Sequence, residues 1–180
     1  MNGPMETRQA YELRQGGSNR LSGYAAVFNA VSRDLGGFTE SIRPGAFTRS
    51  LKDSNNVLAL YDHDRKSILG RVGAGTLKLE QDRRGLKFQI DLPDTSIGKD
   101  LAVLVERGDV AGASFAFSVP KSGDAWNRRN GVAHRELIDV NLHEITITGT
   151  PAYPDTSVAK RGMPGFTPRL SLALKFMETL

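Results

Sequence analysis

Three short segments of the chain carry side chains that could together do hydrolytic chemistry. The first contains His63, which lies just beyond the apolar residues 57–61, so we expect it at the end of a strand, where side chains border a cleft. An imidazole in such a place can act as a general base near neutral pH. A lone histidine there is more often a surface turn residue, so both interpretations stay open at this point.

The second segment, residues 110–119, contains Ser114 among small residues. Phe115 and Phe117 share one parity of a strand and are expected to face the core, which places Ser114 on the opposite face. The segment superficially resembles the G-x-S-x-G nucleophile elbow, but its last position is Ala116 and the pattern that follows is that of a strand. Because the elbow requires a strand-to-helix turn, an α/β-hydrolase is excluded. Ser114 is then either a nucleophile or a small residue that lets two strands pack closely.

The third segment, residues 136–151, changes the phase of its apolar positions. Even-numbered positions are apolar up to Leu142, whereas odd-numbered positions are apolar from Ile145 onward. Such a change predicts a β-bulge near His143 and Glu144, and bulges are frequent beside active sites. If the later phase governs, Glu144 shares a face with the threonines that follow it. A structural bulge with two solvated polar residues is the alternative.

The elements that must position these side chains are mostly strands. Apolar and polar residues alternate with period two over much of the chain, which predicts an antiparallel β domain rather than βαβ units. The predicted strands are residues 10–14, 20–28, 37–42, 56–61, 69–72, 76–80, 86–92, 113–119 and 136–148. Nine short strands favour a closed or nearly closed barrel. Residues 121–131 predict a polar connection that holds the single tryptophan, Trp126.

Two helices are predicted between the strands. The clearer one spans residues 97–107, with Thr95 or Ser96 as its N-cap and Gly108 just past its end, where a left-handed residue is expected. A shorter helix is expected after Pro44.

The length of 180 residues, set against about 150 for a typical domain, predicts one domain with additions. A third apolar stripe predicts a helix over residues 168–178, and a Gly- and Pro-rich stretch separates it from the rest. We therefore expect a domain over residues 1–160, followed by a flexible link and an amphipathic helix or tail over residues 161–180.

Composition excludes several classes of function. Cysteine is absent, which rules out a disulfide scaffold and cysteine-based metal sites and fits a reducing, cytosolic compartment. The longest apolar runs are far shorter than the ~20 residues that span a bilayer, and no signal peptide is expected. The net charge of +4 comes from scattered basic pairs rather than one stripe, so nucleic acid is not an expected partner. The three histidines lack the spacing of a helical zinc site, so no metal is predicted.

Taken together, the order and spacing of these segments resemble the tailed-phage prohead protease family. An apolar strand ends in His63 and an aspartate, and a Gly-x-Ser-Phe-x-Phe strand with Ser114 follows about fifty residues later. A Glu-Ile-Thr-Ile-Thr strand beginning at Glu144 then closes in Thr-Pro-Ala-Tyr-Pro. Residues 38–47 also match the family's acidic segment with Pro-Gly-Ala-Phe. The resemblance covers about residues 21–155.

That resemblance implies a serine endopeptidase whose fold is similar to the herpesvirus maturational protease, a mainly antiparallel β-barrel ringed by a few helices. The matching positions imply Ser114 as the nucleophile, His63 as the general base and Glu144 as the third member of a catalytic triad. Herpesvirus relatives use a second histidine in the third role, so the neighbouring His143 is the alternative. The turn at Gly149 and Thr150 is the candidate for the amides that stabilise the oxyanion.

The resemblance also implies the setting of the reaction. The expected substrate is a protein, either the scaffolding protein or the scaffold segment of the major capsid protein, and the enzyme is expected to cut itself as well. Cleavage would take place inside the assembling prohead in the cytoplasm of a bacterial host, from a phage or an integrated prophage. No cofactor, nucleic acid or membrane is expected, and the herpesvirus relatives suggest a homodimer. The competing hypothesis is a non-enzymatic β-barrel of the virion that binds the shell.

Overall fold

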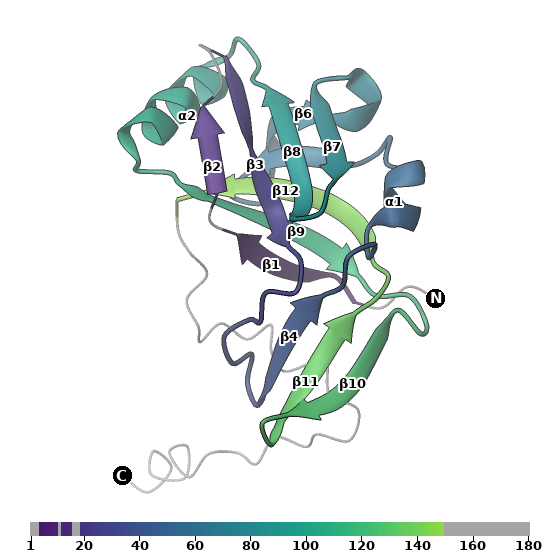
Figure 1. Cartoon of the computed structure of the whole chain (residues 1–180). Helices are drawn as coiled ribbons and strands as arrows, with labels where there is room; N and C mark the ends of the chain where they lie inside the picture. Colours follow the sequence, from purple (N-terminus) through teal and green to yellow (C-terminus); the bar gives the residue numbers. More distant parts are fainter. Residues whose placement is uncertain (1–3, 11, 16–18, 150–180) are drawn as a thin grey trace, which may run out of the picture.

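The strands within the described residues form three sheets. The computed structural model describes residues 4–10, 12–15 and 19–149 (Figure 1). The five-stranded sheet has the order β1 (Glu6–Ala10), β9 (Gly112–Ser118), β12 (Asn141–Thr148), β5 (Leu58–Tyr61), β6 (Asp64–Arg71). The four-stranded sheet has the order β2 (Glu12–Gln15), β3 (Arg20–Val27), β8 (Gly85–Asp91), β7 (Leu77–Gln81). The three-stranded sheet has the order β10 (Asp124–Arg129), β11 (Val132–Leu137), β4 (Phe38–Ile42).

The mainly β class predicted from the sequence is confirmed, although the described strands do not close into one barrel. Most neighbouring strands are antiparallel, but β12 pairs with β5 and β11 pairs with β4 in parallel. Alternation with period two does not distinguish the two directions, because side chains alternate in both. Parallel partners need a long crossover between them, and 79 residues (141 − 61 − 1) separate the end of β5 from the start of β12.

Three strand predictions need correction. The polar connection predicted over residues 121–131 contains β10, which forms a hairpin with β11. Its turn residues Asn130 and Gly131 both have positive φ, 52° and 82°, as a two-residue hairpin turn requires. The strand predicted over 136–148 is divided between β11 and β12, and Leu137 rather than Ile138 is fully buried. The strand predicted over 10–14 corresponds mainly to β2, and β1 precedes it without having been predicted.

Both predicted helices within the described residues are present. Helix α2 (Ser96–Arg107) begins after Thr95, whose hydroxyl accepts a hydrogen bond from the Gly98 amide, and ends at Gly108 with φ of 82°. It lies beside β2 (Figure 1). Helix α1 (Thr48–Lys52) is the short helix expected after Pro44, and a 3₁₀ turn, η1 (Val72–Ala74), follows β6. The helix predicted over 168–178 lies outside the described residues. Among the helices that the structure does describe, none is long and apolar enough to span a membrane.

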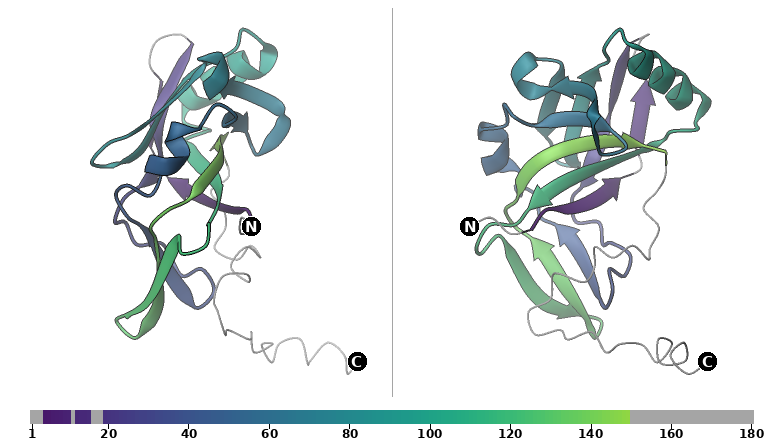
Figure 2. Two further views of the ribbon diagram at one scale, coloured as in Figure 1. Left: turned by 90° about the vertical axis from the view of Figure 1, so that its right-hand side faces the viewer. Right: turned by 180° about the vertical axis from the view of Figure 1, so that it is seen from behind.

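One face of the five-stranded sheet packs into the main hydrophobic core, and the other face carries the candidate site residues. Phe115 and Phe117 of β9, together with Ile145 and Ile147 of β12, belong to this core, and the two phenylalanine rings stack at 5.1 Å. Phe47, just before α1, packs edge-on against Phe115 at 5.6 Å. Figure 2 shows β12, β9 and β1 running side by side. Because side chains alternate along a strand, the opposite face of β9 and β12 carries their serine, threonine and glutamate side chains.

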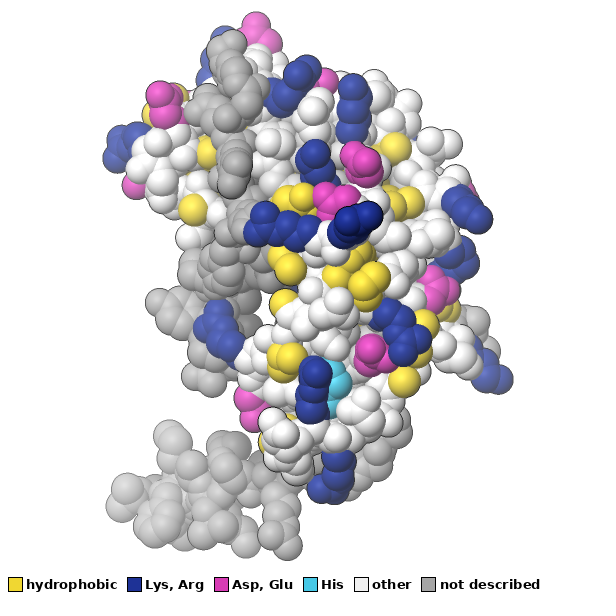
Figure 3. Space-filling view, in the orientation of Figure 1, with side chains coloured by type: hydrophobic (Ala, Val, Ile, Leu, Met, Phe, Trp, Pro, Cys, Tyr) yellow, Lys and Arg dark blue, Asp and Glu magenta, His cyan; other side chains and the backbone are white. Residues whose placement is uncertain are grey.

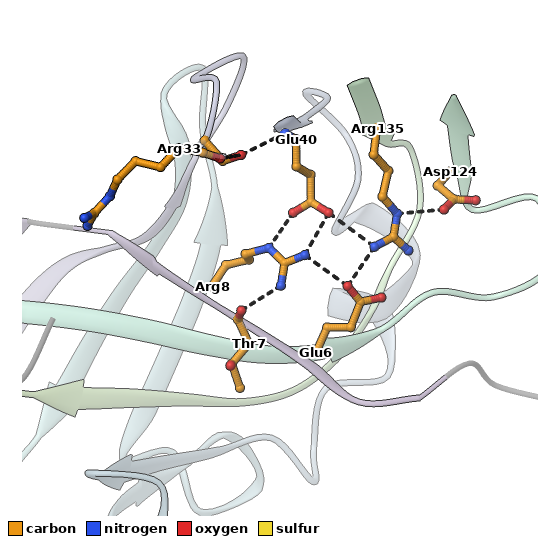
Figure 4. Close-up of polar contacts among 8 residues, drawn as sticks. Glu6, Thr7, Arg8, Arg33, Glu40, Asp124 and Arg135 are labelled. Atoms are coloured by element: carbon orange, nitrogen blue, oxygen red, sulfur yellow. Dashed lines mark hydrogen bonds and ion pairs between the residues drawn. The ribbon is translucent and has the colours of Figure 1, made fainter. Parts of the chain in front are cut away.

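A buried network of ion pairs joins β1 to the three-stranded sheet (Figure 4). Arg8 of β1 bonds both carboxylate oxygens of Glu40 at 2.7 and 2.9 Å, and Arg135 of β11 bonds Glu6 at 2.7 Å and Glu40 at 3.3 Å. Asp124 pairs with Arg135 at 2.7 Å. Burial alone lowers the pKa of Arg135, but these carboxylates raise it above its usual value, so the guanidinium stays charged. Since a buried charge without its partner is costly, this network fixes β1 along β9.

Candidate active site

His63 lies at the tip of the β5–β6 hairpin, at the end of β5 as the sequence indicates. Tyr61 pairs with Asp64, so Asp62 and His63 form a two-residue loop. Both loop residues have positive φ, 49° for Asp62 and 58° for His63, which matches the backbone of a tight hairpin turn. The imidazole is partly exposed, with 37% of the side chain accessible. The tight turn therefore carries a solvent-accessible base directly beyond a buried strand.

Glu144 of β12 holds the ring of His63. Its carboxylate Oε1 lies 2.8 Å from His63 Nδ1, and its side chain is only 7% exposed. In the neutral ring, Nδ1–H donates to this carboxylate, which leaves the lone pair on Nε2. The arrangement fixes both the tautomer and the ring orientation that a general base requires.

The bulge predicted from the change of phase is present and separates Glu144 from His143. The β9–β12 register shifts between Leu142 and Glu144, so His143 is the additional residue. Its Nε2 lies 2.8 Å from the hydroxyl of Ser118. Burial lowers the pKa of His143, an effect that Glu144 opposes. Of the two candidates for the third role, the structure brings Glu144 to His63 and places His143 against a different serine.

Ser114 lies on the same sheet face, opposite Thr146 of β12 in the register. It is 1% exposed, and among the described residues its Oγ is the single buried side-chain oxygen or nitrogen that has no hydrogen-bond partner. No hydrogen bond joins it to His63 in this conformation. A buried hydroxyl without a partner costs about 1–3 kcal/mol, and such atoms are rare in native proteins.

Sequence reasoning missed Thr146, which connects the two halves of the site. Its Oγ1 accepts a hydrogen bond from the His63 amide at 2.9 Å. The available signal was its position two residues after Glu144, on the face assigned by the later phase of the strand.

The residues proposed for the oxyanion are placed only in part. Gly149 is exposed and follows the end of β12, near Asp109 and Val110. It is three residues beyond Thr146, about 10 Å along an extended chain, and Thr150 lies outside the described residues. The oxyanion donors therefore stay a prediction.

Two further observations concern other ligands. Within residues 4–10, 12–15 and 19–149, no group of three or more His, Cys, Asp or Glu side chains could hold a metal ion. On the face shown in Figure 3, Lys and Arg side chains are scattered among Asp and Glu rather than gathered in one stripe.

Comparison with known proteins agrees with this chemistry. A histidine bound to a carboxylate, beside a strand that carries a serine, is a combination of side chains that serine hydrolases use. The sequence model of the caudovirus prohead serine proteases matches residues 5–166, and the chain belongs to this family. It is therefore a serine protease of phage capsid maturation, as the resemblance indicated.

One solved structure supports the fold. The chain is similar to the bacteriophage T4 capsid assembly protease gp21, with a TM-score of 0.55 and 10% identity, over 82% of this chain and 99% of that one. No curated protein matches the sequence.

Proposed function

We propose that the chain is a serine endopeptidase in which Ser114 is the nucleophile, His63 the general base and Glu144 the third member of the triad. The observation that carries the proposal is the 2.8 Å contact between Glu144 and His63, on the sheet face that also bears the orphaned hydroxyl of Ser114. A serine hydroxyl is a weak nucleophile at neutral pH and needs an adjacent base. The family membership and the sequence positions of the three residues support the same assignment.

The steps of the reaction follow from these positions. His63 Nε2 takes the proton of Ser114 Oγ as the oxygen bonds to the carbonyl carbon of the scissile peptide. Glu144 stabilises the imidazolium that forms, and backbone amides, for which Gly149 and Thr150 are the candidates, stabilise the oxyanion. When the tetrahedral intermediate collapses, the C–N bond breaks and His63 returns the proton to the leaving amine. Water, activated by the same imidazole, then releases the acyl group from Ser114.

The conformation described here precedes the attack. Ser114 Oγ is buried and makes no hydrogen bond to His63, so the two must come together as the substrate binds. Catalytic hydrogen bonds are often long or absent without substrate and tighten in the bound complex.

The substrate we propose is the scaffolding protein or the scaffold segment of the major capsid protein, cut inside the prohead in the host cytoplasm, together with the enzyme itself. The family supports a protein substrate in the prohead, because its members are prohead proteases. Residues 161–180 are then either a segment removed by self-cleavage or one that docks on the shell. Assembly as a homodimer is part of the proposal.

The test is co-expression with the major capsid or scaffolding protein of the same phage, followed by the intact mass of every product. Ser114→Ala should abolish trimming of the partner and of the chain itself. Ser118→Ala is the matched control, because Ser118 lies on the same strand and the same face, and it should trim normally. If Ser114→Ala also trims normally, the assignment is wrong. If wild type trims nothing but assembles with the shell, a non-enzymatic shell-binding protein is the better description.

A further inference from the structure

The hairpin turn that carries His63 has an unusual backbone. Both residues of the loop lie in the left-handed region, which favours glycine and which side chains enter at a cost. A glycine is the usual second residue of such turns, whereas this position holds the proposed base. The conformation therefore needs support from outside the hairpin.

That support comes from β12. The Asp62 amide donates to the carbonyl of Ile147 at 3.0 Å, and the next amide, that of His63, donates to the hydroxyl of Thr146 at 2.9 Å. The Thr146 hydroxyl in turn donates to the Leu60 carbonyl at 3.1 Å. Thr146 is fully buried, so water does not compete for these bonds. One hydroxyl thus joins the backbone of Leu60 in β5 to the backbone of His63 in the turn.

The two hydrogen bonds of the Thr146 hydroxyl, here called the Thr146 clamp, lie next to the proposed catalytic residues. Thr146 lies opposite Ser114 in the β9–β12 register and two residues after Glu144 on the same face. Strand β12 therefore fixes His63 at two points, its backbone through Thr146 and its ring through Glu144. A misplacement of about 1 Å can cost about 10²-fold in rate, so a second restraint on the base is valuable.

We propose that Thr146 is a positioning residue of this protease, whose hydroxyl holds the turn of His63 so that the ring meets both Glu144 and Ser114. This inference rests on the proposed function for its effect on cleavage, but not for its effect on the ring. Thr146 does not touch the substrate in this role; it acts through His63.

The alternative is that Thr146 only fills space in the sheet, and two substitutions separate these roles. Thr146→Val keeps the branched shape and removes the hydroxyl, whereas Thr146→Ser keeps the hydroxyl and removes the methyl group. A positioning role predicts that serine rescues function and valine does not. A packing role predicts the reverse order.

The experiment has two readouts. One is the initial rate of partner trimming by the purified enzyme, and the other is the low-field proton NMR signal of His63 Nδ1–H bonded to Glu144, assigned by its loss in His63→Gln. We expect Thr146→Val to trim about 10- to 100-fold more slowly and to lose the NMR signal, and Thr146→Ser to retain the signal and most of the rate. Thr148→Val is the matched control, since Thr148 is buried two residues further along the same face.

The outcomes distinguish this inference from the proposed function. If wild type trims and Thr146→Val trims equally well with the signal intact, the positioning role is wrong and the triad stands. If wild type does not trim but the signal still depends on the Thr146 hydroxyl, the clamp stands and the proposed function fails. Should Thr146→Val not fold, Thr146→Ser compared with Thr146→Ala gives the same test, because they differ by the hydroxyl alone.

Discussion

Strand β9 carries two serines, Ser114 and Ser118, four residues apart, and each belongs to a separate serine–histidine arrangement. At one, Ser118 and His143 are hydrogen-bonded at 2.8 Å, and Asn141 also donates to the Ser118 hydroxyl at 3.4 Å. At the other, Ser114 makes no hydrogen bond, although the face it shares also carries the carboxylate that binds His63. Judged by distance alone, the first pair has the shorter path from hydroxyl to imidazole.

The difference shows that the serine with the better hydrogen bonds is not the one that we propose as the nucleophile. The Ser118 hydroxyl has partners on both sides and completes the hydrogen bonding of the bulge, which is a structural role. Burial lowers the pKa of His143, which disfavours its charged form, and the carboxylate of the adjacent Glu144 is turned to His63 instead. At Ser114 the hydroxyl has no partner, and under the proposed mechanism it meets His63 when the substrate binds.

The largest difference in cleavage rate is expected between substitutions of the two histidines, His63 and His143. His63→Gln should lower the trimming rate by about 10³-fold or more, because it removes the proposed general base. His143→Gln should trim close to wild type, since its ring is hydrogen-bonded to Ser118 rather than to the proposed nucleophile. The measurement is the initial rate of partner cleavage for each purified variant, with thermal unfolding to verify folding. Equal losses in both variants would mean that the two arrangements act as one site.

A smaller loss is expected at the carboxylate. Glu144→Gln keeps the shape of the side chain but removes the charge that stabilises the imidazolium, and should lower the rate by about 10²–10⁴-fold while leaving Ser114 and His63 in place. Ser118→Ala serves again as the control, because it changes the bulge without touching His63. An unchanged rate in Glu144→Gln would transfer the third role to His143.

The sequence predicted this contrast only in part, for physical reasons. The parity of Phe115 placed Ser114 on the outer face, and the shift of phase before Ile145 located the bulge, because strand periodicity is local information. The direction in which His143 points is not local. It depends on the β9–β12 register and on the parallel partner β5, which joins the sheet from 79 residues away. The same long-range pairing creates the Thr146 clamp.

The alternation of apolar and polar residues also could not predict whether the strands form one barrel or separate sheets. Alternating residues are compatible with a barrel or with separate sheets, and the outcome was decided by contacts between distant segments such as Arg8 with Glu40 and Arg135 with Glu6. Hairpin β10–β11 could have been found, since Asn130-Gly131 is a strong signal for a two-residue turn. Its strands were overlooked because the charged residues at the end of β10 are exposed on both faces.

The smallest expected effect concerns the pH dependence of protein stability that arises from His143, in the Ser118–His143 pair. Because burial lowers the pKa of His143, the folded protein binds a proton there less readily than the unfolded chain, whose ring titrates near pH 6.5. The contribution of the neutral His143 ring to the free energy of unfolding is therefore fully present above that pH, and it is lost as the pH falls below it. Urea unfolding at pH 7.5 and 5.5 should show a larger loss of stability for wild type than for His143→Gln. Burial also lowers the pKa of His134, but that residue is present in both proteins and cancels. Equal losses would show that His143 is as easily protonated as a free histidine, and the contrast between the two pairs would then rest on hydrogen bonding alone.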